Sequence, residues 1–239
     1  MNKKVQALAV SGVLTVGVIG GTLAWFTSQD KATNTFNTAS NSDNNGNGIK
    51  IEEEFEKPTN MLPGDNVNKD VQVSNTATYD QFIRVKFIPR FVELGKDSNG
   101  KEVRTPITER KTSDGTMHQL DTNKIILNFT ERFNKDIKDI KDAANGTWVK
   151  GNDGYYYYMG KVAPEKWTNT LLDSVTLDTA AGNEYRGLGF DIDVEATSTQ
   201  ASNDAHKDWA KGSGLIEKFD ELQKQGVVDP IDAKETNQK

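Results

Sequence analysis

The chain has 239 residues, with 29 lysines and arginines against 35 aspartates and glutamates, and it contains no cysteine. A chain of this length can bury one large core. A net charge of −6 without a clustered basic stretch disfavours nucleic acid and anionic lipid as partners. Since no disulfide can form, the fold must be held by its sheets and its core alone.

The N-terminus has the pattern of a signal peptide over residues 1–24. Two early lysines precede a long apolar stretch, and small residues lead up to Ala24. We expect signal peptidase to cut between Ala24 and Trp25, which removes the two lysines and changes the net charge from −6 to −8. The alternative is an uncleaved membrane anchor, because the apolar stretch is long enough to span a bilayer.

The first half of the mature chain alternates apolar and polar residues, which predicts half-buried strands. These strands are expected at residues 31–38, 49–55, 67–73 and 82–88. We expect Pro89 to end the fourth strand. Residues 91–122 are polar and rich in turns, and they indicate an insertion or long loop with at most short strands.

The second half continues this pattern with one helical interruption. Further strands are predicted at residues 123–130, 168–178 and 188–198, and a hairpin at residues 147–162. Apolar residues at helical spacing predict a short helix over residues 131–143. Eight or nine short strands separated by turns predict an all-β fold, a jelly-roll-like antiparallel β-sandwich with short helices in loops and near the C-terminus.

The C-terminal part changes to helical patterning. Residues 201–204 can cap a short helix that carries Trp209, which we expect to lie as a lid on one end of the sandwich. Residues 212–226 predict an amphipathic helix. Its apolar stripe consists of Leu215, Ile216, Phe219 and Leu222. The predicted organisation is therefore a signal peptide (1–24), a sandwich domain (25–211), and a C-terminal helix with a polar tail (212–239).

Several stretches of the sequence carry a family resemblance. The leader ending "GGTLAWFTSQDKA", the following "FNTA", and "LPGD" before a strand resemble the TasA/camelysin family of Gram-positive biofilm-matrix fibre proteins, which are exported through a SipW-type signal peptidase. The stretches "GYYYYMGKVAPEKWTNTLLDSV" and "VEATSTQASNDAHKDW" look like the clostridial, BsaA-type branch. The resemblance implies a secreted jelly-roll subunit of the extracellular matrix or cell surface. Its implied partners are further copies of itself, other matrix components and, during export, the signal peptidase.

The resemblance also implies that residues 25–38 form a donor strand that inserts into the sheet of the next subunit. An unpaired strand has free N–H and C=O groups, which the open edge of another sheet can satisfy. Burial of Trp25, Phe26 and Phe36 in the neighbour would contribute about 1.5–3 kcal/mol each. The alternative is a strand that folds back into its own sheet, and a monomer can pair with itself before it assembles.

One segment matches a calcium-binding loop. Asp43, Asn45 and Asn47 occupy its first, third and fifth positions, and Glu54 occupies its twelfth. Against calcium, the alternation of apolar residues predicts a strand at 49–55, which would point Glu54 away from the loop. We therefore favour a polar loop that leads into a strand, and we expect no cofactor.

Camelysins have been described as metalloendopeptidases, so enzymatic activity must be weighed. The sequence contains no H-E-x-x-H motif, and a zinc site without cysteine would need both histidines and carboxylates as ligands. His118 and His206 are far apart in sequence, and both lie in polar surroundings. We expect both to be exposed to solvent and the protein not to be an enzyme. A secreted metalloendopeptidase is the alternative.

The run Tyr155–Tyr158 could form an aromatic face for a glycan or a partner, which would indicate a monomeric surface adhesin as a further alternative. In a strand, however, successive side chains point to opposite faces. We therefore expect one pair of tyrosines to pack in the core and the other pair to cover the sheet or an interface.

Overall fold

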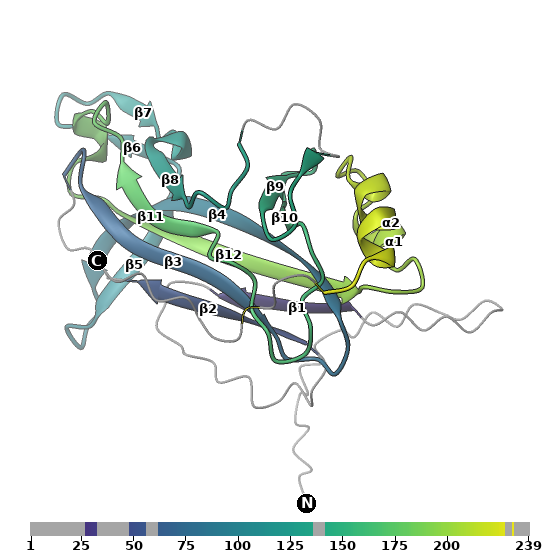
Figure 1. The fold of residues 1–239 in the computed structure, drawn as a ribbon. Helices are drawn as coiled ribbons and strands as arrows, with labels where there is room; N and C mark the ends of the chain where they lie inside the picture. Colours follow the sequence, from purple (N-terminus) through teal and green to yellow (C-terminus); the bar gives the residue numbers. More distant parts are fainter. Residues whose placement is uncertain (1–26, 33–47, 56–61, 136–141, 228–230, 232–239) are drawn as a thin grey trace, which may run out of the picture.

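The computed structural model describes residues 27–32, 48–55, 62–135, 142–227 and 231, which form a sandwich of two antiparallel sheets (Figure 1). Among these residues, the large sheet has six strands: β1 (Thr27–Ala32), β12 (Gly189–Gln200), β4 (Gln81–Lys96), β10 (Tyr156–Tyr158) and β9 (Trp148–Lys150) in this order, with β5 (Glu102–Ile107) also paired with β4. The small sheet has four: β2 (Ile49–Phe55), β3 (Asn66–Asn75), β11 (Leu172–Leu177) and β8 (Ile125–Phe129). The predicted all-β sandwich is confirmed.

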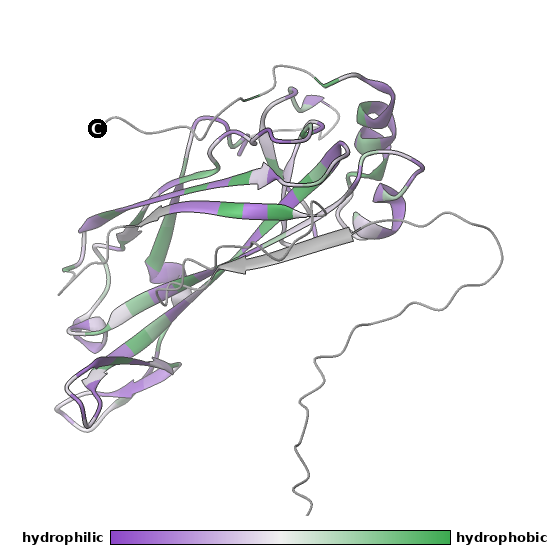
Figure 2. Ribbon diagram, turned by 90° about the horizontal axis from the view of Figure 1, so that it is seen from below, coloured by the Kyte–Doolittle hydropathy of each residue, from purple (hydrophilic) through white to green (hydrophobic). Residues whose placement is uncertain are grey.

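The pairing of β4 with β12 runs through the middle of the large sheet. The two strands are in register from Gly189 opposite Val92 to Gln200 opposite Gln81. Both strands alternate apolar and polar residues, as predicted, and Figure 2 shows this alternation of hydropathy along the strands. Every other strand of the large sheet is attached directly or indirectly to this pair.

The prediction that Pro89 ends its strand is wrong. Pro89 lies inside β4, opposite Ile192 of β12. The backbone N–H of Gln81 bonds to Val162 on the side away from β12, and alternation gives the nitrogen of residue 89 the same direction. On that side, β10 is paired with β4 only up to Val85 and β5 only from Phe91 onward. The missing N–H of proline therefore removes no hydrogen bond of the ladder.

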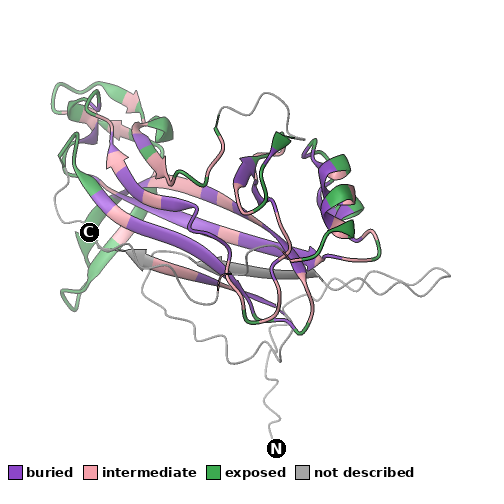
Figure 3. Cartoon of the chain, viewed as in Figure 1, coloured by how far each residue is buried: buried purple, intermediate pink, exposed green. Residues whose placement is uncertain are grey.

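The main core lies between the two sheets. The inward side chains of β4 and β12 meet those of the small sheet, because alternate residues of each strand point to the same face. This core includes Ile83, Val85, Phe87, Ile192, Val194 and Ala196 from the large sheet and Ile51, Val71, Val73, Leu172 and Val175 from the small sheet. Figure 3 shows the middle of the sandwich as buried and the end that carries β5, β6 (Glu109–Lys111) and β7 (Met117–Gln119) as largely exposed.

A second core lies on the outer face of the large sheet, beneath two C-terminal helices. The helices are α1 (His206–Trp209) and α2 (Ile216–Lys224), and they lie beside β9 and β10 (Figure 1). The predicted apolar stripe of α2 is confirmed, since Leu215, Phe219 and Leu222 are buried and Ile216 packs against them. The stripe covers Phe82, Val149, Tyr157 and Met159. The helix thus forms a third layer over one end of the sandwich.

The tyrosine run follows the predicted alternation. Tyr156 and Tyr158 are in the main core, whereas Tyr157 is in the second core and Tyr155 packs against it. The run therefore contributes side chains to both cores and connects the sandwich to the helical layer. Three of its four members are buried, so it does not provide the exposed aromatic face that an adhesin would need.

Two loop predictions differ from the structure. The expected long loop at 91–122 is wrong in its first part, because β4 continues to Lys96 and forms a hairpin with β5. The rest contains the short hairpin of β6 and β7 and one turn of 3-10 helix, η1 (Thr122–Lys124). Of the helix expected at 131–143, residues 136–141 lie outside the described residues. Phe133 forms a parallel β-bridge with Trp148 instead of a helical turn.

One ion pair lies inside the sandwich. Lys69 on β3 is completely buried, and its Nζ lies 3.1 Å from Oε1 of Glu53 on β2. Burial lowers the pKa of the Lys69 amine, and the Glu53 carboxylate acts in the opposite direction. The Glu53 carboxylate therefore offsets part of the cost of burying this amine. None of the described helices has the length and apolar character needed to cross a membrane.

The helical layer should contribute strongly to stability. We expect Phe219→Ala to lower the free energy of unfolding by about 3–5 kcal/mol, because it leaves a cavity beneath α2. Lys224→Ala, at an exposed position of the same helix, should change it by less than about 0.5 kcal/mol. Urea unfolding followed by tryptophan fluorescence measures both values, and equal effects would mean that α2 does not pack on the sheet.

The buried pair of Lys69 and Glu53 predicts that loss of the Glu53 charge lowers the free energy of unfolding by an amount that depends on pH. Glu53→Gln should destabilise the protein by about 3 kcal/mol at pH 7, because it removes the carboxylate that lies 3.1 Å from the buried Lys69 ammonium. The pKa of Lys69 is lower in the folded than in the unfolded chain, so the unfolded chain binds more protons and stability rises with pH. Loss of the Glu53 carboxylate lowers this pKa further, so the variant gains more stability with rising pH than the native chain does. The penalty should therefore shrink as the pH rises from 7 toward 10.5.

The matched control is Glu52→Gln, which removes a partly exposed pair with Lys50 on the same strand. Its effect should stay below about 1 kcal/mol at either pH. A Glu53→Gln penalty that does not change between pH 7 and pH 10 in urea titrations would contradict the assignment to Lys69.

Candidate assembly interface

The outermost strand of the large sheet is β1. It pairs antiparallel with the second half of β12, from Thr27 opposite Thr199 to Ala32 opposite Val194. It also contacts β2 of the small sheet. It thus lies along the seam of the sandwich, where the β12 edge of the large sheet comes close to the β2 edge of the small sheet. Its backbone forms the last strand of the large sheet there.

The direction of the hydrogen bonds on β12 follows from one contact at its end. The N–H of Ala201 donates to the C=O of Asp80, so the odd-numbered residues of β12 face β4. The even-numbered residues Val194, Ala196 and Ser198 therefore direct their N–H and C=O groups toward β1. Their β1 partners are Ala32, Asp30 and Ser28.

The attachment of β1 is of moderate strength. A six-residue edge strand can form about six backbone hydrogen bonds, each contributing about 0.5–1.5 kcal/mol. The total of several kcal/mol is similar to the stability of a whole domain, which is about 5–15 kcal/mol. Without β1, the inward side chains of Val194 and Ala196 would lie at an open sheet edge, which is the type of edge that recruits another strand.

The predicted donor segment is only partly described. Residues 27–32 form β1, whereas Trp25, Phe26 and Phe36 lie outside the described residues, as does the expected cleavage site after Ala24. In the single chain, β1 pairs with its own β12. This is the self-paired arrangement that was considered for the monomer, and pairing with another copy stays a prediction.

The predicted calcium loop also lies mostly outside the described residues. Asp43, Asn45 and Asn47 belong to the segment 33–47 that the structure does not describe. The expected strand at 49–55 is β2, so Glu54 lies within a strand of the small sheet. The described residues therefore test neither calcium binding by this segment nor the polar loop that the sequence favours.

The expectation that both histidines are exposed is wrong for His206. His118 lies on β7 and is half-buried, but the His206 side chain is completely buried. Its ring packs against Phe82 and Phe219, with centroids 5.9 Å and 6.1 Å away. The surrounding sequence is polar, but the turn into α1 directs this ring beneath the helical layer. His118 and His206 lie at opposite ends of the fold, so they do not share a metal site (Figure 1).

A small group of ligand-type side chains surrounds His206. Its Nε2 lies 2.9 Å from Oδ1 of Asp220, and the carboxylate of Asp204 lies nearby. The Nζ of Lys207 lies 2.8 Å from Asp204 Oδ2 and 3.7 Å from Asp220 Oδ1. The ammonium group thus already provides a cation between the two carboxylates. A metal ion would have to displace it and would find a single histidine ligand.

No sequence pattern indicated the role of Arg84. Its Nε donates to Thr197 Oγ1 at 2.8 Å, and its Nη1 donates to the Tyr157 hydroxyl at 2.9 Å. Its guanidinium lies over the rings of Tyr155 and Trp209, 4.1 Å and 4.9 Å from their centroids. This network holds α1 on the outer face of β4 and β12. Trp209, expected as a lid, covers that face and donates from Nε1 to Thr197.

A proline pair tests the attachment of β1. Asp30→Pro removes an N–H that points toward β12, whereas Gln29→Pro removes one that points away. We expect Asp30→Pro to lower the hydrogen-exchange protection of the Ala196 amide at least tenfold. Gln29→Pro is the matched control and should leave it nearly unchanged. Equal loss in both variants would contradict this pairing of β1.

Comparison with known proteins shows that the N-terminal part of the chain is similar to one family. Residues 1–108, which include β1 to β5, match the family described as "Camelysin metallo-endopeptidase". No curated protein and no solved structure matches the chain. The predicted resemblance to the TasA/camelysin family is thereby confirmed, and the clostridial branch stays a prediction. The match covers less than half of the chain, and it shows that residues 1–108 are similar to the camelysin family.

Proposed function

We propose that the protein is a secreted structural subunit that polymerises into extracellular matrix fibres by exchange of β1 between copies. The observation that supports this function most directly is the position of β1. It is an edge strand, joined to one neighbouring strand of the large sheet by a backbone ladder, and it closely follows the expected cleavage site after Ala24. Such a strand can be replaced by its counterpart from another copy.

Exchange in the same register conserves the contacts of the monomer. The β1 strand of one copy would bond to Val194, Ala196 and Ser198 of the next, so that each β12 edge remains paired. Sixteen residues separate Ala32 from Ile49. Fully extended, they could reach about 50–60 Å, which is enough to enter a neighbouring copy. Repeated donation in one direction yields an open chain of subunits, because the contact is heterologous.

The family match agrees with this proposal. It covers the leader, β1 and the strands that follow, so the matched part contains the proposed donor. Export would begin with the signal peptide and end with cleavage after Ala24 by a SipW-type peptidase, which would free the donor. The product would be an extracellular homopolymer of a Gram-positive matrix or cell surface, without enzymatic activity.

Mixed disulfide formation tests exchange between copies, since the native chain has no cysteine. One secreted variant carries Lys31→Cys, and a second carries Glu195→Cys, its partner across β1 and β12. We expect the mixture to form a disulfide between the two chains during assembly. The matched control replaces the second variant by Thr199→Cys. Residue 199 lies four residues beyond residue 195 along β12, about 13 Å from it, and is therefore not opposite residue 31.

The polymer itself is examined by negative-stain electron microscopy. The chain without residues 25–38 should stay folded and monomeric, whereas the secreted chain should form filaments. Filaments from the truncated chain, or mixed disulfides that form as readily in the control pair, would refute the exchange of β1.

Proteolysis is the second candidate function, favoured by the description of the matched family and by the side chains around His206. We expect the secreted protein to show no chelator-sensitive cleavage of casein, because Lys207 already lies between Asp204 and Asp220. Chelator-sensitive activity that is lost in His206→Gln but kept in His118→Gln would establish an enzyme instead.

A further inference from the structure

In the part of the chain that the structure describes, the seam opposite β1 is open. In the large sheet β1 and β9 lie at opposite edges, and in the small sheet β2 and β8 do the same. Between β8 and the pair of β9 and β10 there is a hollow of about 880 Å³. One seam of the sandwich is thus closed by β1, whereas the other contains a groove of a size that can hold an extended peptide segment.

The wall of the groove formed by β8 has a backbone edge to which none of the described strands is paired. The N–H of Thr130 donates to Leu171 at 3.0 Å, and the C=O of Lys124 accepts from Asp178 at 2.8 Å, so the even-numbered residues face β11. Leu127 and Phe129 therefore direct their N–H and C=O groups into the groove, where no described residue bonds to them.

The edge of β9 in the same groove is already occupied. The N–H of Trp148 donates to the C=O of Arg132 at 2.7 Å, and the C=O of Trp148 accepts from Asn134 at 2.9 Å. An incoming strand would therefore add to β8 and not to β9. The additional strand would therefore extend the small sheet and not the large sheet.

The floor of the groove is aromatic. Phe129, Phe133 and Tyr156 line it, with ring centroids 4.6–5.4 Å apart. Phe129 and Phe133 are only half-buried, although they belong to a cluster that continues to Phe87 in the main core. An extended segment that lay on this floor would cover them with every second side chain.

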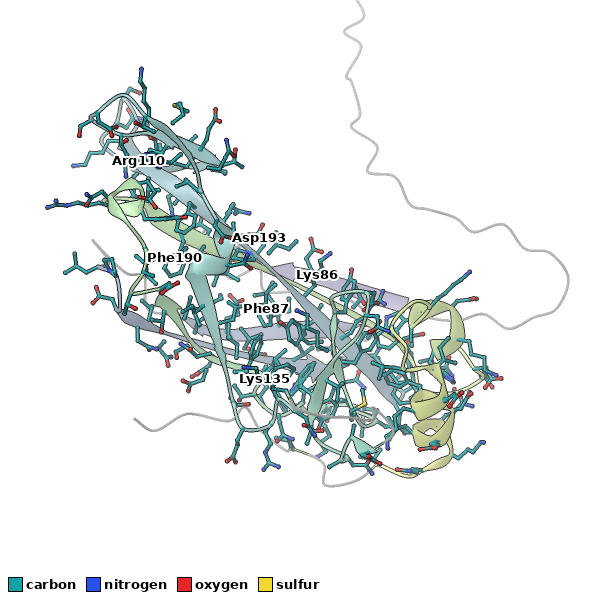
Figure 4. All side chains as sticks on the ribbon, turned by 90° about the horizontal axis from the view of Figure 1, so that it is seen from above. Lys86, Phe87, Arg110, Lys135, Phe190 and Asp193 are labelled. Atoms are coloured by element: carbon teal, nitrogen blue, oxygen red, sulfur yellow. The ribbon has the colours of Figure 1, made fainter. Side chains whose placement is uncertain are left out.

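The charge of the groove is opposite to that of the protein. The charged residues among its described lining are Lys135, labelled in Figure 4, and Lys150, and both are exposed. The Nζ of Lys150 lies 5.4 Å from the centroid of Tyr156, at the border of the aromatic floor. In a chain of net charge −6, this is a basic rim around an apolar floor, which favours an acidic ligand.

We propose that this groove binds an extended peptide segment from another protein, in which apolar residues alternate with acidic ones and which adds a strand to β8. The free N–H and C=O groups of Leu127 and Phe129 hold its backbone, the aromatic floor receives its apolar side chains, and Lys135 and Lys150 pair with its carboxylates. An acidic polysaccharide would use the lysines but would leave the backbone edge of β8 without partners. The edge therefore favours a peptide.

The test uses the secreted chain and a fluorescein-labelled, end-capped peptide of seven residues that alternates valine with aspartate or glutamate. Fluorescence anisotropy should show saturable binding that weakens as salt is added. Lys135→Glu together with Lys150→Glu should weaken it about tenfold, through lost charge pairs and new repulsion. The control, Lys96→Glu with Lys101→Glu on the exposed hairpin of β4 and β5, has the same net charge and should bind as the unchanged protein.

Two N-methylated peptides test strand addition. One carries methyl groups on the odd-numbered amides and the other on the even-numbered amides, so that each blocks one edge of the extended peptide. One of the two should lose at least tenfold in affinity while the other binds like the parent. Equal affinities would overturn the proposal. It would also be overturned by absence of binding, or by an oligogalacturonate that binds with the same dependence on the two lysines.

Discussion

The structure depends on the pairing of β4 with β12. Both strands carry apolar side chains on their inner faces, and over the first half of β4 the outer faces are covered as well, so this pair separates two cores. The small sheet packs on one side of it and the helices on the other. In a chain without disulfides, this ladder and the two cores supply the stability that covalent links provide in many secreted proteins.

The same pair determines what is available for binding at each margin of the sandwich. On one margin β12 presents backbone groups that β1 satisfies, and on the other β8 presents groups that no described residue satisfies. The two margins differ in chemistry as well. The β1 position is occupied by a segment of the chain itself, whereas the groove at β8 combines an aromatic floor with lysines.

Much of this fold could be predicted from alternation alone. Six strands of the sandwich (β2, β3, β4, β8, β11 and β12), the hairpin at the tyrosines and the stripe of α2 follow from apolar periodicity, because each of these elements has one face in a core. The strand expected at 31–38 is observed at 27–32 as β1, and residues 33–38 lie outside the described residues. The position of Pro89 inside a strand could not be predicted from the sequence. Whether a proline interrupts a strand depends on whether its missing N–H would have faced a paired strand, and this is determined by the strands that flank β4. The burial of His206 and the role of Arg84 depend on contacts between residues far apart in sequence, which a local pattern does not contain. For the candidate site, the sequence indicated the strand but not its register on β12.

The third layer has a consequence for the material that such subunits would form. Because α1 and α2 cover the outer face of the large sheet, copies cannot stack sheet on sheet at that end as they do in amyloid. A fibre would then be a string of folded globules, each as stable as its own core. It should melt cooperatively when the globules unfold, and it should dissolve in moderate denaturant, unlike amyloid.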